Sequence, residues 1–415
     1  MEAVAKIDQK INGGNAETSS GESVDADTLR RCRILGELIA RGLSGKTETF
    51  PEEIGREDSE WLCQASYENM MDPVILPQII DYCEEAGKEN LRSRVHYSMI
   101  RSLIQMRSAT EIGVYFEKEK IRHQFLKGTM MKRIYPNYEL RDMGDIDVVV
   151  DESQIEEAER VLTKLGYTKG ASEDHHHCFL QEPFLVVELH WDLYDRHRDR
   201  RQYLYFRDRS CRKALKGREF GQSFDPVDFY IYMIAHSARH FYETGCGIRH
   251  LVDVYVYCTK KKEELEPERL RKGLEACGLV HFERKIRELA FAWIEQRPLT
   301  EEQVNLLMYM IDSGVHGKSE NGIWAMLAED SLSSGEEKNA KCSFLFPSYT
   351  KMQELYPWLE KRPYLLPAGW VMRAFRGLRD REAVERAKKV RDMDAKQARK
   401  MIDLYKSMDL RLTRD

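Results

Sequence analysis

The sequence predicts an α+β fold, in which a small mixed sheet with helices on one side is flanked by N- and C-terminal helical regions. Apolar residues recur at helical spacing over residues 27–120 and again over 223–415. Between them, residues 121–222 contain short apolar runs bounded by glycine, proline and charged residues, which is typical of strands. We therefore expect a tail over 1–26, an N-terminal helical region, an α/β core and a C-terminal helical region.

Composition limits the class of protein. The chain has 415 residues, of which 42% are hydrophobic and 33% charged, so we expect a globular protein with more than one domain. A net charge of −5 argues against a general nucleic-acid binder, although a local basic patch would still allow nucleic acid as a partner. No apolar run is long enough to span a membrane, and the N-terminus lacks a signal-type apolar segment. Nine scattered cysteines without a Cys-x-x-Cys pair indicate reduced thiols, so we expect a cytoplasmic protein.

The N-terminal part divides into a tail and helices. Residues 1–26 are rich in Gly, Ser, Asn and Glu and have almost no apolar periodicity, which predicts disorder. Two helical patterns follow, with the apolar residues Leu29, Cys32, Leu35, Ile39 and Leu43 in the first and Val95, Met99, Leu103, Met106 and Ile112 in the second.

The middle of the chain has strand signals around one predicted helix. "IRHQFLKG" and "DIDVVV" are strand candidates, and "HHHCFLQEPFLVVELHWDL" predicts two strands joined by a tight turn at Glu182 and Pro183. The segment "SQIEEAERVLTKLGY" predicts a helix with Ser153 as N-cap, Glu156 completing a capping box and Gly166 ending it.

Helices return in the C-terminal half. Asp225 followed by Pro226 is typical of a helix N-cap and first turn. Beyond residue 371, Val371, Phe375 and Leu378 recur at helical spacing in a basic segment. We interpret that segment as a solvated helix rather than a nucleic-acid or membrane contact, because its acidic residues dilute the positive field.

Two aspartates at the mouth of a predicted core strand are the main functional signal. Residues two apart on a strand point to the same face, so Asp145 and Asp147 project together. Their mutual repulsion would protonate one of them unless a cation lies between them, and Mg²⁺, or Mn²⁺ in its place, is such a cation. Glu188, on a predicted neighbouring strand, supplies a third carboxylate if the strands pair, and His190 shares its face. We expect Asp145, Asp147 and Glu188 to be the metal ligands and the catalytic centre.

A second group of residues is suited to phosphate binding. Lys127, Gly128 and Thr129 lie at a predicted strand-to-helix turn. Glycine allows the backbone to approach a phosphate closely, and a lysine supplies a compact positive charge. Arg141, four residues before Asp145, is a further candidate.

The order "LKG…YP…R…GDID", apolar run, helix and "VELHW" resembles the uncharacterised nucleotidyltransferase family, a branch of the polymerase-beta-like superfamily, over residues 95–260. The resemblance implies a small sheet with helices behind it. It also implies transfer of a nucleoside monophosphate from a nucleoside triphosphate to an unidentified hydroxyl-bearing acceptor, with release of pyrophosphate. Asp145 and Asp147 match the metal-binding pair, Glu188 the third carboxylate and Gly128 the glycine that touches the triphosphate. Two departures weaken the match at the phosphates: Lys-Gly-Thr replaces the usual Gly-Ser, and a longer segment separates Gly128 from Asp145.

Other interpretations remain open. Asp145 and Asp147 could cap a turn, Glu188 and His190 could lie on the polar face of an edge strand, and the chain could be a catalytically silent binding or scaffold relative or a metal-dependent phosphohydrolase. We interpret the triplet 175–177, three histidines, as solvated.

The roles of two further residue pairs depend on where the fold places them. His236 and His240 lie four apart on one predicted helix face, where lining the active site is favoured over zinc binding because no His-Glu-x-x-His pattern is present. Arg249 and Asp253 have the spacing of an ion pair on a helix, either at the surface or partly buried against the sheet.

Overall fold

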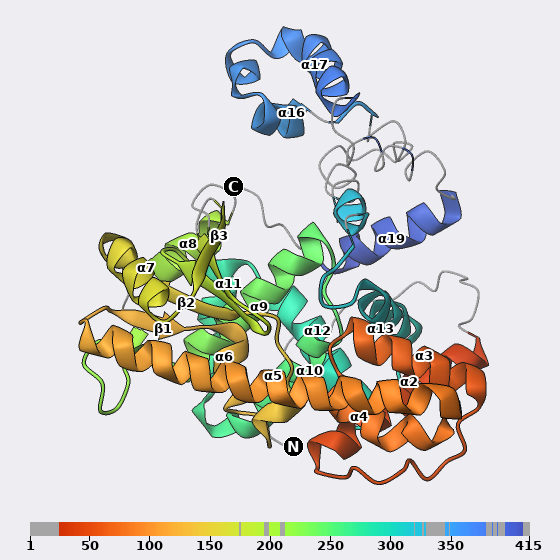
Figure 1. Cartoon of the computed structure of the whole chain (residues 1–415). Helices are drawn as coiled ribbons and strands as arrows, with labels where there is room; N and C mark the ends of the chain where they lie inside the picture. Colours follow the sequence, from red (N-terminus) through yellow and green to blue (C-terminus); the bar gives the residue numbers. More distant parts are fainter. Residues whose placement is uncertain are drawn as a thin grey trace.

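The computed structural model describes residues 25–173, 176–194, 199–207, 212–318, 320–325, 345–347, 349–378 and 395–409, together with the single residues 328, 384 and 388. Helices dominate, and one mixed sheet of five strands lies on the side of the molecule where the yellow and green segments meet (Figure 1). The predicted α+β fold with flanking helices is confirmed. Of the predicted disordered tail, residues 1–24 lie outside the described residues.

The N-terminal region is a group of four helices: α2 (Ala26–Leu43), α3 (Arg56–Glu68), α4 (Asp72–Ile79) and α5 (Glu85–Lys118). The Asp25 side chain caps α2 by accepting a hydrogen bond from the Thr28 amide at 2.8 Å. The long helix α5 extends from this group to the sheet, so it joins the two halves of the molecule (Figure 1).

The sheet has the strand order β1-β2-β5-β4-β3. Its strands are β1 (His123–Phe125), β2 (Ile146–Val150), β3 (Thr168–Glu173), β4 (His176–Gln181) and β5 (Leu185–His190). The pair β2 and β5 is parallel and the other pairs are antiparallel. Four of these strands were predicted, whereas β3 was not. A separate two-stranded sheet, β6 (Arg212–Ala214) with β7 (Gln222–Phe224), was also not predicted.

One face of the five-stranded sheet is covered by α5 and α7 (Ile155–Lys164). On this face Val148 and Val150 of β2 pack with Val187 and Leu189 of β5 and with apolar residues of both helices. Strand alternation sends Asp147 and Val149 to the opposite face, and Val149 belongs to a different apolar core. The sheet therefore has one dry face and one face that carries polar groups.

The N-terminus of α7 differs from the prediction. The expected capping box of Ser153 and Glu156 is wrong, because residues 152–154 form a 3₁₀ turn and α7 begins at Ile155 without a side-chain cap. The Gln154 side chain in the cap position instead contacts the 120–122 backbone, accepting from the Arg122 amide at 2.9 Å. Tertiary contacts have replaced the local cap at this helix.

The C-terminal region packs on the N-terminal helices. Its described α-helices are α9 (Pro226–Glu243), α10 (Arg249–Lys260), α11 (Pro267–Cys277), α12 (Val280–Ile294), α13 (Glu301–Ser313), α16 (Tyr349–Leu355), α17 (Leu366–Leu378) and α19 (Ala395–Ser407). Helix α8 (Arg200–Arg207) precedes this region and belongs to the α/β core. The predicted Asp225 cap of α9 is present. Trp293 donates to the Cys32 carbonyl at 2.7 Å, and residues of both helical regions form one continuous apolar core. The N- and C-terminal helical regions therefore share one core, although the α/β core lies between them in the sequence.

Some predicted apolar faces lie in solvent. Leu29 is 43% exposed and Leu103 51% exposed, whereas Cys32, Leu35, Ile39 and Ile112 are buried. Among the described helices, none is both long and apolar enough to cross a membrane.

Candidate active site

Strand register brings acidic, imidazole and thiol side chains together on the polar face of the sheet. Asp147 of β2 lies opposite Glu188 of β5, and Glu188 lies opposite Cys178 of β4. Two residues beyond Glu188 on β5, His190 lies opposite His176 of β4. The face therefore presents a row of two carboxylates and a thiol beside a pair of imidazoles. The three strands position all five groups without any flexible loop.

Asp147 is the centre of a buried charge network. Its Oδ1 accepts from Lys127 Nζ at 2.7 Å and lies 3.0 Å from His190 Nε2, while His190 Nε2 also lies 3.3 Å from Glu188 Oε2. Burial alone would raise the pKa of Asp147, but Lys127 and His190 together lower it below its ordinary value. The same contacts raise the pKa of Lys127 and of His190 despite their burial. Asp147 is therefore ionised at neutral pH.

Asp145 precedes β2 and has a different environment. Burial, with repulsion from Asp147 and Glu188, raises the pKa of Asp145 to about 6. Such a shift shows that these acidic side chains repel one another at the buried end of β2. A divalent cation would relieve this repulsion, and carboxylate oxygens are ligands that Mg²⁺ prefers.

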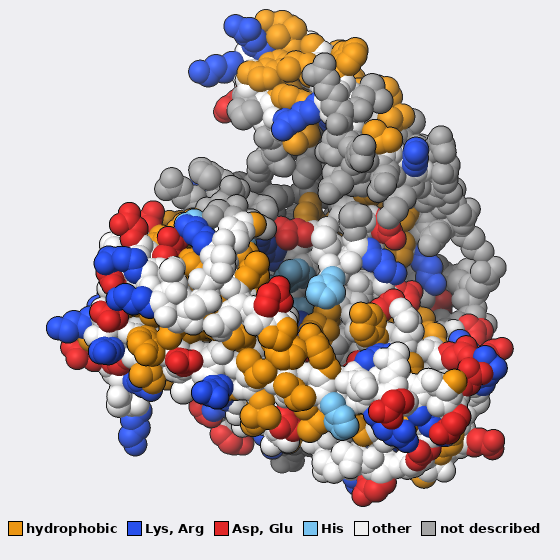
Figure 2. All heavy atoms as spheres, viewed as in Figure 1, with side chains coloured by type: hydrophobic (Ala, Val, Ile, Leu, Met, Phe, Trp, Pro, Cys, Tyr) orange, Lys and Arg blue, Asp and Glu red, His pale blue; other side chains and the backbone are white. Residues whose placement is uncertain are grey.

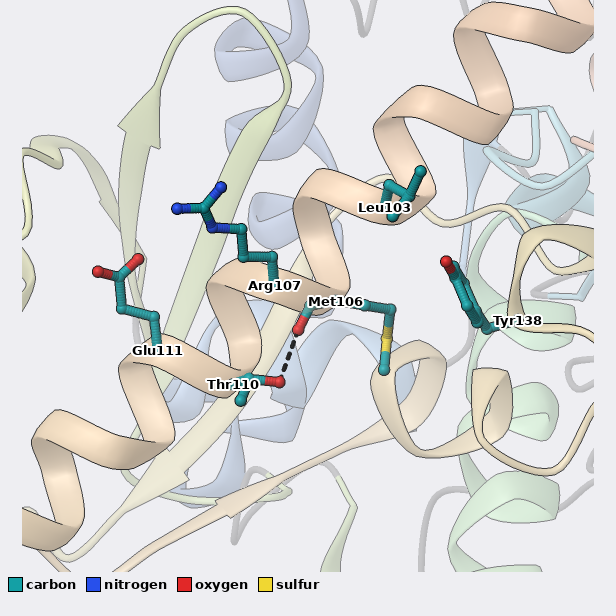
Figure 3. A pocket seen from close by; sticks show the side chains of 6 residues that line it. All are labelled: Leu103, Met106, Arg107, Thr110, Glu111 and Tyr138. Atoms are coloured by element: carbon teal, nitrogen blue, oxygen red, sulfur yellow. Dashed lines mark hydrogen bonds between the residues drawn. The ribbon is translucent and has the colours of Figure 1, made fainter.

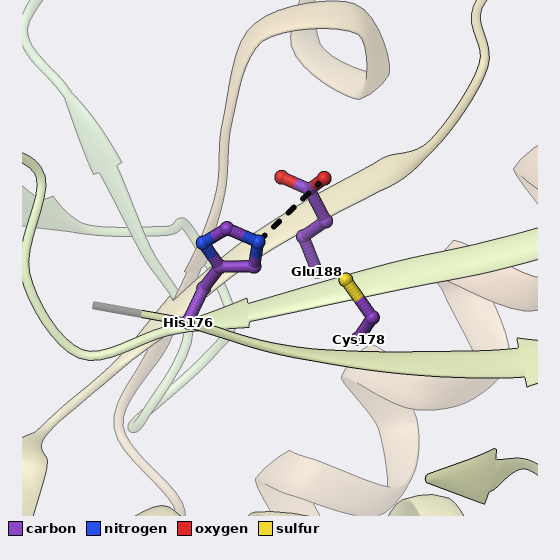
Figure 4. A group of neighbouring side chains, drawn as sticks. All are labelled: His176, Cys178 and Glu188. Atoms are coloured by element: carbon purple, nitrogen blue, oxygen red, sulfur yellow. Dashed lines mark ion pairs between the residues drawn. The ribbon is translucent and has the colours of Figure 1, made fainter. Parts of the chain in front are cut away.

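The described residues include two groups of three side chains that could hold a metal ion. Within each group, the potential ligand atoms lie within 4.8 Å of one another. The first is Asp147, Glu188 and His190; the second is His176, Cys178 and Glu188 (Figure 4). Glu188 belongs to both groups. Asp145, which we predicted as a ligand, belongs to neither in this arrangement.

The Lys-Gly-Thr turn lies where the sequence predicted it, at the start of α6 (Lys127–Lys132). Lys127 has a φ of +35°, a conformation that costs a non-glycine residue about 1–3 kcal/mol. A Cβ on Gly128 would lie 2.8 Å from Arg141 Nη1 and 2.9 Å from Met143 Sδ, so close packing requires glycine there. The Thr129 hydroxyl is buried, with no hydrogen-bond partner within the described part of the chain.

Arg141 is held by a buried ion pair. Its Nε and Nη2 donate to the two Asp253 oxygens, both at 2.8 Å, and Tyr135 donates to the same carboxylate at 2.8 Å. Arg249, our predicted partner for Asp253, instead donates to the Asp142 carbonyl at 3.0 Å. The ion pair thus connects α10 to the segment before Asp145. A phosphate contact by Arg141 stays a prediction.

Three histidines on α9 and α10, His236, His240 and His250, form a cluster, and His236 and His240 lie near the Lys127 charge. The His236 and His240 ring centroids are 4.3 Å apart, and the His250 ring lies 6.1 Å from His236 and 6.2 Å from His240. Burial, with the Lys127 charge, lowers the pKa of His240 to about 4, and burial with the His240 charge lowers the pKa of His250 to about 3. His240 and His250 are therefore neutral at pH 7. Histidine side chains also gather near an acidic one at a central hollow on the face shown in Figure 2.

Two surface pockets flank α5. One, of about 550 Å³, is lined by Leu103, Met106, Arg107, Thr110, Glu111 and Tyr138 and includes none of the predicted site residues (Figure 3). The other, of about 720 Å³, includes Ser98, Arg101 and Asp142, so it reaches the segment that leads to Asp145. The lining of the second pocket likewise includes none of the candidate carboxylates, and Asp142 is its nearest residue in sequence to Asp145.

The sequence interpretation missed several residues of the site. The histidine triplet was interpreted as solvated, which is wrong for His176, a buried residue on the polar face; His175 lies outside the described residues. Cys178 and His250 were not predicted either. The alternation from His176 to Cys178 could have indicated Cys178, whereas His250 has no sequence pattern that distinguishes it from a core residue.

Comparison with known proteins identifies a family that the chain matches. The model of a family described as uncharacterised nucleotidyltransferase matches residues 78–295, just over half of the chain. The matched segment extends from the end of α4 to the end of α12 and therefore contains the whole five-stranded sheet together with α9 and α10. No curated protein and no solved structure matches the chain.

Proposed function

This chain belongs to the uncharacterised nucleotidyltransferase family, and from that premise we propose that it transfers a nucleoside monophosphate from a nucleoside triphosphate to a hydroxyl-bearing acceptor, with Mg²⁺ as cofactor and pyrophosphate as product. The observation that carries this proposal is the parallel pairing of Asp147 with Glu188, beside Asp145, on the polar face of the sheet. A polymerase-beta-like arrangement would place catalytic carboxylates in this way.

In this proposal Asp145, Asp147 and Glu188 hold the metal. When bound, Mg²⁺ neutralises charge on the transferring phosphoryl group and on the attacking and leaving oxygens. Lys127 and His190 contact Asp147 Oδ1 and position the carboxylate that would hold the metal. The Lys127 ammonium supplies a compact positive charge beside this carboxylate, which favours binding of the triphosphate.

Glu188 has a second role in the proposal. Its side chain is 22% exposed, more than that of Asp147 at 2%, so Glu188 faces the open part of the site. A carboxylate in that position can accept the proton of an acceptor hydroxyl as the new bond forms. His190, 3.3 Å from its Oε2, would orient it.

The test combines binding and turnover. The purified chain is incubated with each of the four labelled nucleoside triphosphates, Mg²⁺ and a lysate, and labelled product and pyrophosphate are measured. Asp147→Asn should abolish turnover, whereas Asp403→Asn, at an exposed carboxylate on α19, should not change it.

The alternatives predict different results. Release of label as free nucleotide without a labelled acceptor would support a phosphohydrolase. Absence of both turnover and a triphosphate-dependent rise in melting temperature would indicate a silent binding relative. Retained turnover in Asp147→Asn would contradict the assignment of the carboxylates.

A further inference from the structure

We propose that His176, Cys178 and Glu188 form a second metal position, which takes a transition ion of the Zn²⁺ or Co²⁺ class rather than Mg²⁺. This position concerns ion binding by the chain itself, and it does not depend on nucleotidyl transfer.

The geometry comes from the pairing of β4 with β5. Cys178 is the cross-strand partner of Glu188, and His176 lies two residues from Cys178 on the same strand, so all three side chains point to one face (Figure 4). One ligand atom from each lies within 4.8 Å of the others, and His176 Nε2 is 3.9 Å from Glu188 Oε1. A tetrahedral ion with ligand bonds of about 2.0–2.3 Å needs only small side-chain rotations to reach them.

The donor types decide the class of ion. Mg²⁺ prefers oxygen ligands, whereas a thiolate with an imidazole and a carboxylate suits zinc and its neighbours in the first transition row. Three protein ligands leave a fourth position open, as in catalytic rather than structural zinc sites. Cys178 is half-buried, so an ion can reach it from solvent.

The shared ligand links this position to the first one. Glu188 also belongs to the group with Asp147 and His190, so one carboxylate can contact ions on both sides. Bridged pairs of ions lie about 3.5–4 Å apart in two-metal enzymes. The sheet therefore provides one oxygen-rich position and one position with sulfur and nitrogen donors.

Cobalt spectroscopy tests the proposal without nucleotide. The full chain, stripped with a chelator and kept reduced, is titrated with Co²⁺ in an excess of Mg²⁺. We expect saturable binding with a thiolate-to-cobalt charge-transfer band in the near ultraviolet. Cys178→Ser should lose this band, and His176→Asn should bind Co²⁺ at least about 10–100-fold more weakly, since loss of an outer partner alone has that effect. Cys258→Ser, at a half-buried cysteine on α10, should keep the band.

The outcomes are distinct from those of the transfer assay. A wild-type chain that binds Co²⁺ without the band, or not at all, would overturn the proposal whether or not the variants fold. A band that survives in Cys178→Ser would overturn it too. Neither result would affect labelled product formed with Mg²⁺, and failure of transfer would leave the cobalt spectrum unchanged.

Discussion

Removing the Asp145 carboxylate should stabilise the metal-free protein. Its pKa rises from an ordinary value of 3.8 to about 6 because the group is buried beside Asp147 and Glu188. A raised pKa in the folded state means that this group favours folding below pH 3.8 and loses that contribution as pH rises through 6. At 1.36 kcal/mol per pKa unit, ionised Asp145 costs the fold about 3 kcal/mol at pH 8.

Asp145→Asn removes this cost, so we expect the variant to be more stable than the wild type by up to about 3 kcal/mol at pH 8, with a smaller gain at pH 5. Urea unfolding in the presence of a chelator measures the free energy of unfolding of both proteins. Asp403→Asn, at an exposed carboxylate, is the matched control and should change stability by less than about 0.5 kcal/mol.

Adding Mg²⁺ should remove most of this difference in stability. A ligand at 100 times its dissociation constant stabilises the protein that binds it by about 2.7 kcal/mol, and the wild type should gain this while Asp145→Asn gains little. Equal or lower stability of the variant at pH 8 with chelator would refute the electrostatic reasoning. An equal gain from Mg²⁺ in both proteins would refute the role of Asp145 as a ligand.

Three further variants test the framework around the site. Burial lowers the pKa of Lys132 from 10.5 to about 7, so the unfolded chain takes up a proton that the folded chain does not, and wild-type stability should rise between pH 7 and 10. Lys132→Met should flatten that rise, which amounts to at most about 4 kcal/mol between pH 7 and 10 before the lost hydrogen bonds are deducted. An unchanged slope in pH-dependent unfolding would contradict this. Asp253→Asn leaves the Arg141 charge buried and uncompensated, so we expect a loss of about 3–5 kcal/mol in the free energy of unfolding. A loss below about 1 kcal/mol would show that the ion pair does not hold the segment before Asp145 against α10. Gly128→Ala places a Cβ 2.8 Å from Arg141 Nη1 and should cost about 1–3 kcal/mol with weakened triphosphate binding by calorimetry. Gly144→Ala, where a Cβ meets nothing within 4 Å, should leave both unchanged, and equal effects of the two glycine variants would count against the packing explanation.

The strands that carry chemistry could be predicted because their signals are local. The apolar run Val148–Val150 and the alternation through Glu188 and His190 fix strand type and face from the sequence alone. β3 was not predicted, because "TKGASE" has neither β-branched alternation nor apolar character and is held only by pairing with β4. The absent capping box at Ser153 has the same origin, since tertiary contacts of Gln154 outweighed local helix chemistry.

By itself, the sequence determined the family and the fold class and indicated the candidate acidic residues, since each depends on residue type and short-range spacing. Only the tertiary structure decided which side chains contact the candidate site residues. The register of β4 against β5 places His176 and Cys178 beside Glu188. The packing of α10 pairs Asp253 with Arg141, whereas the sequence predicted Arg249 as its partner. Such pairings join residues that are 10 to more than 100 positions apart. They are set by the packing of whole elements, which no local pattern encodes.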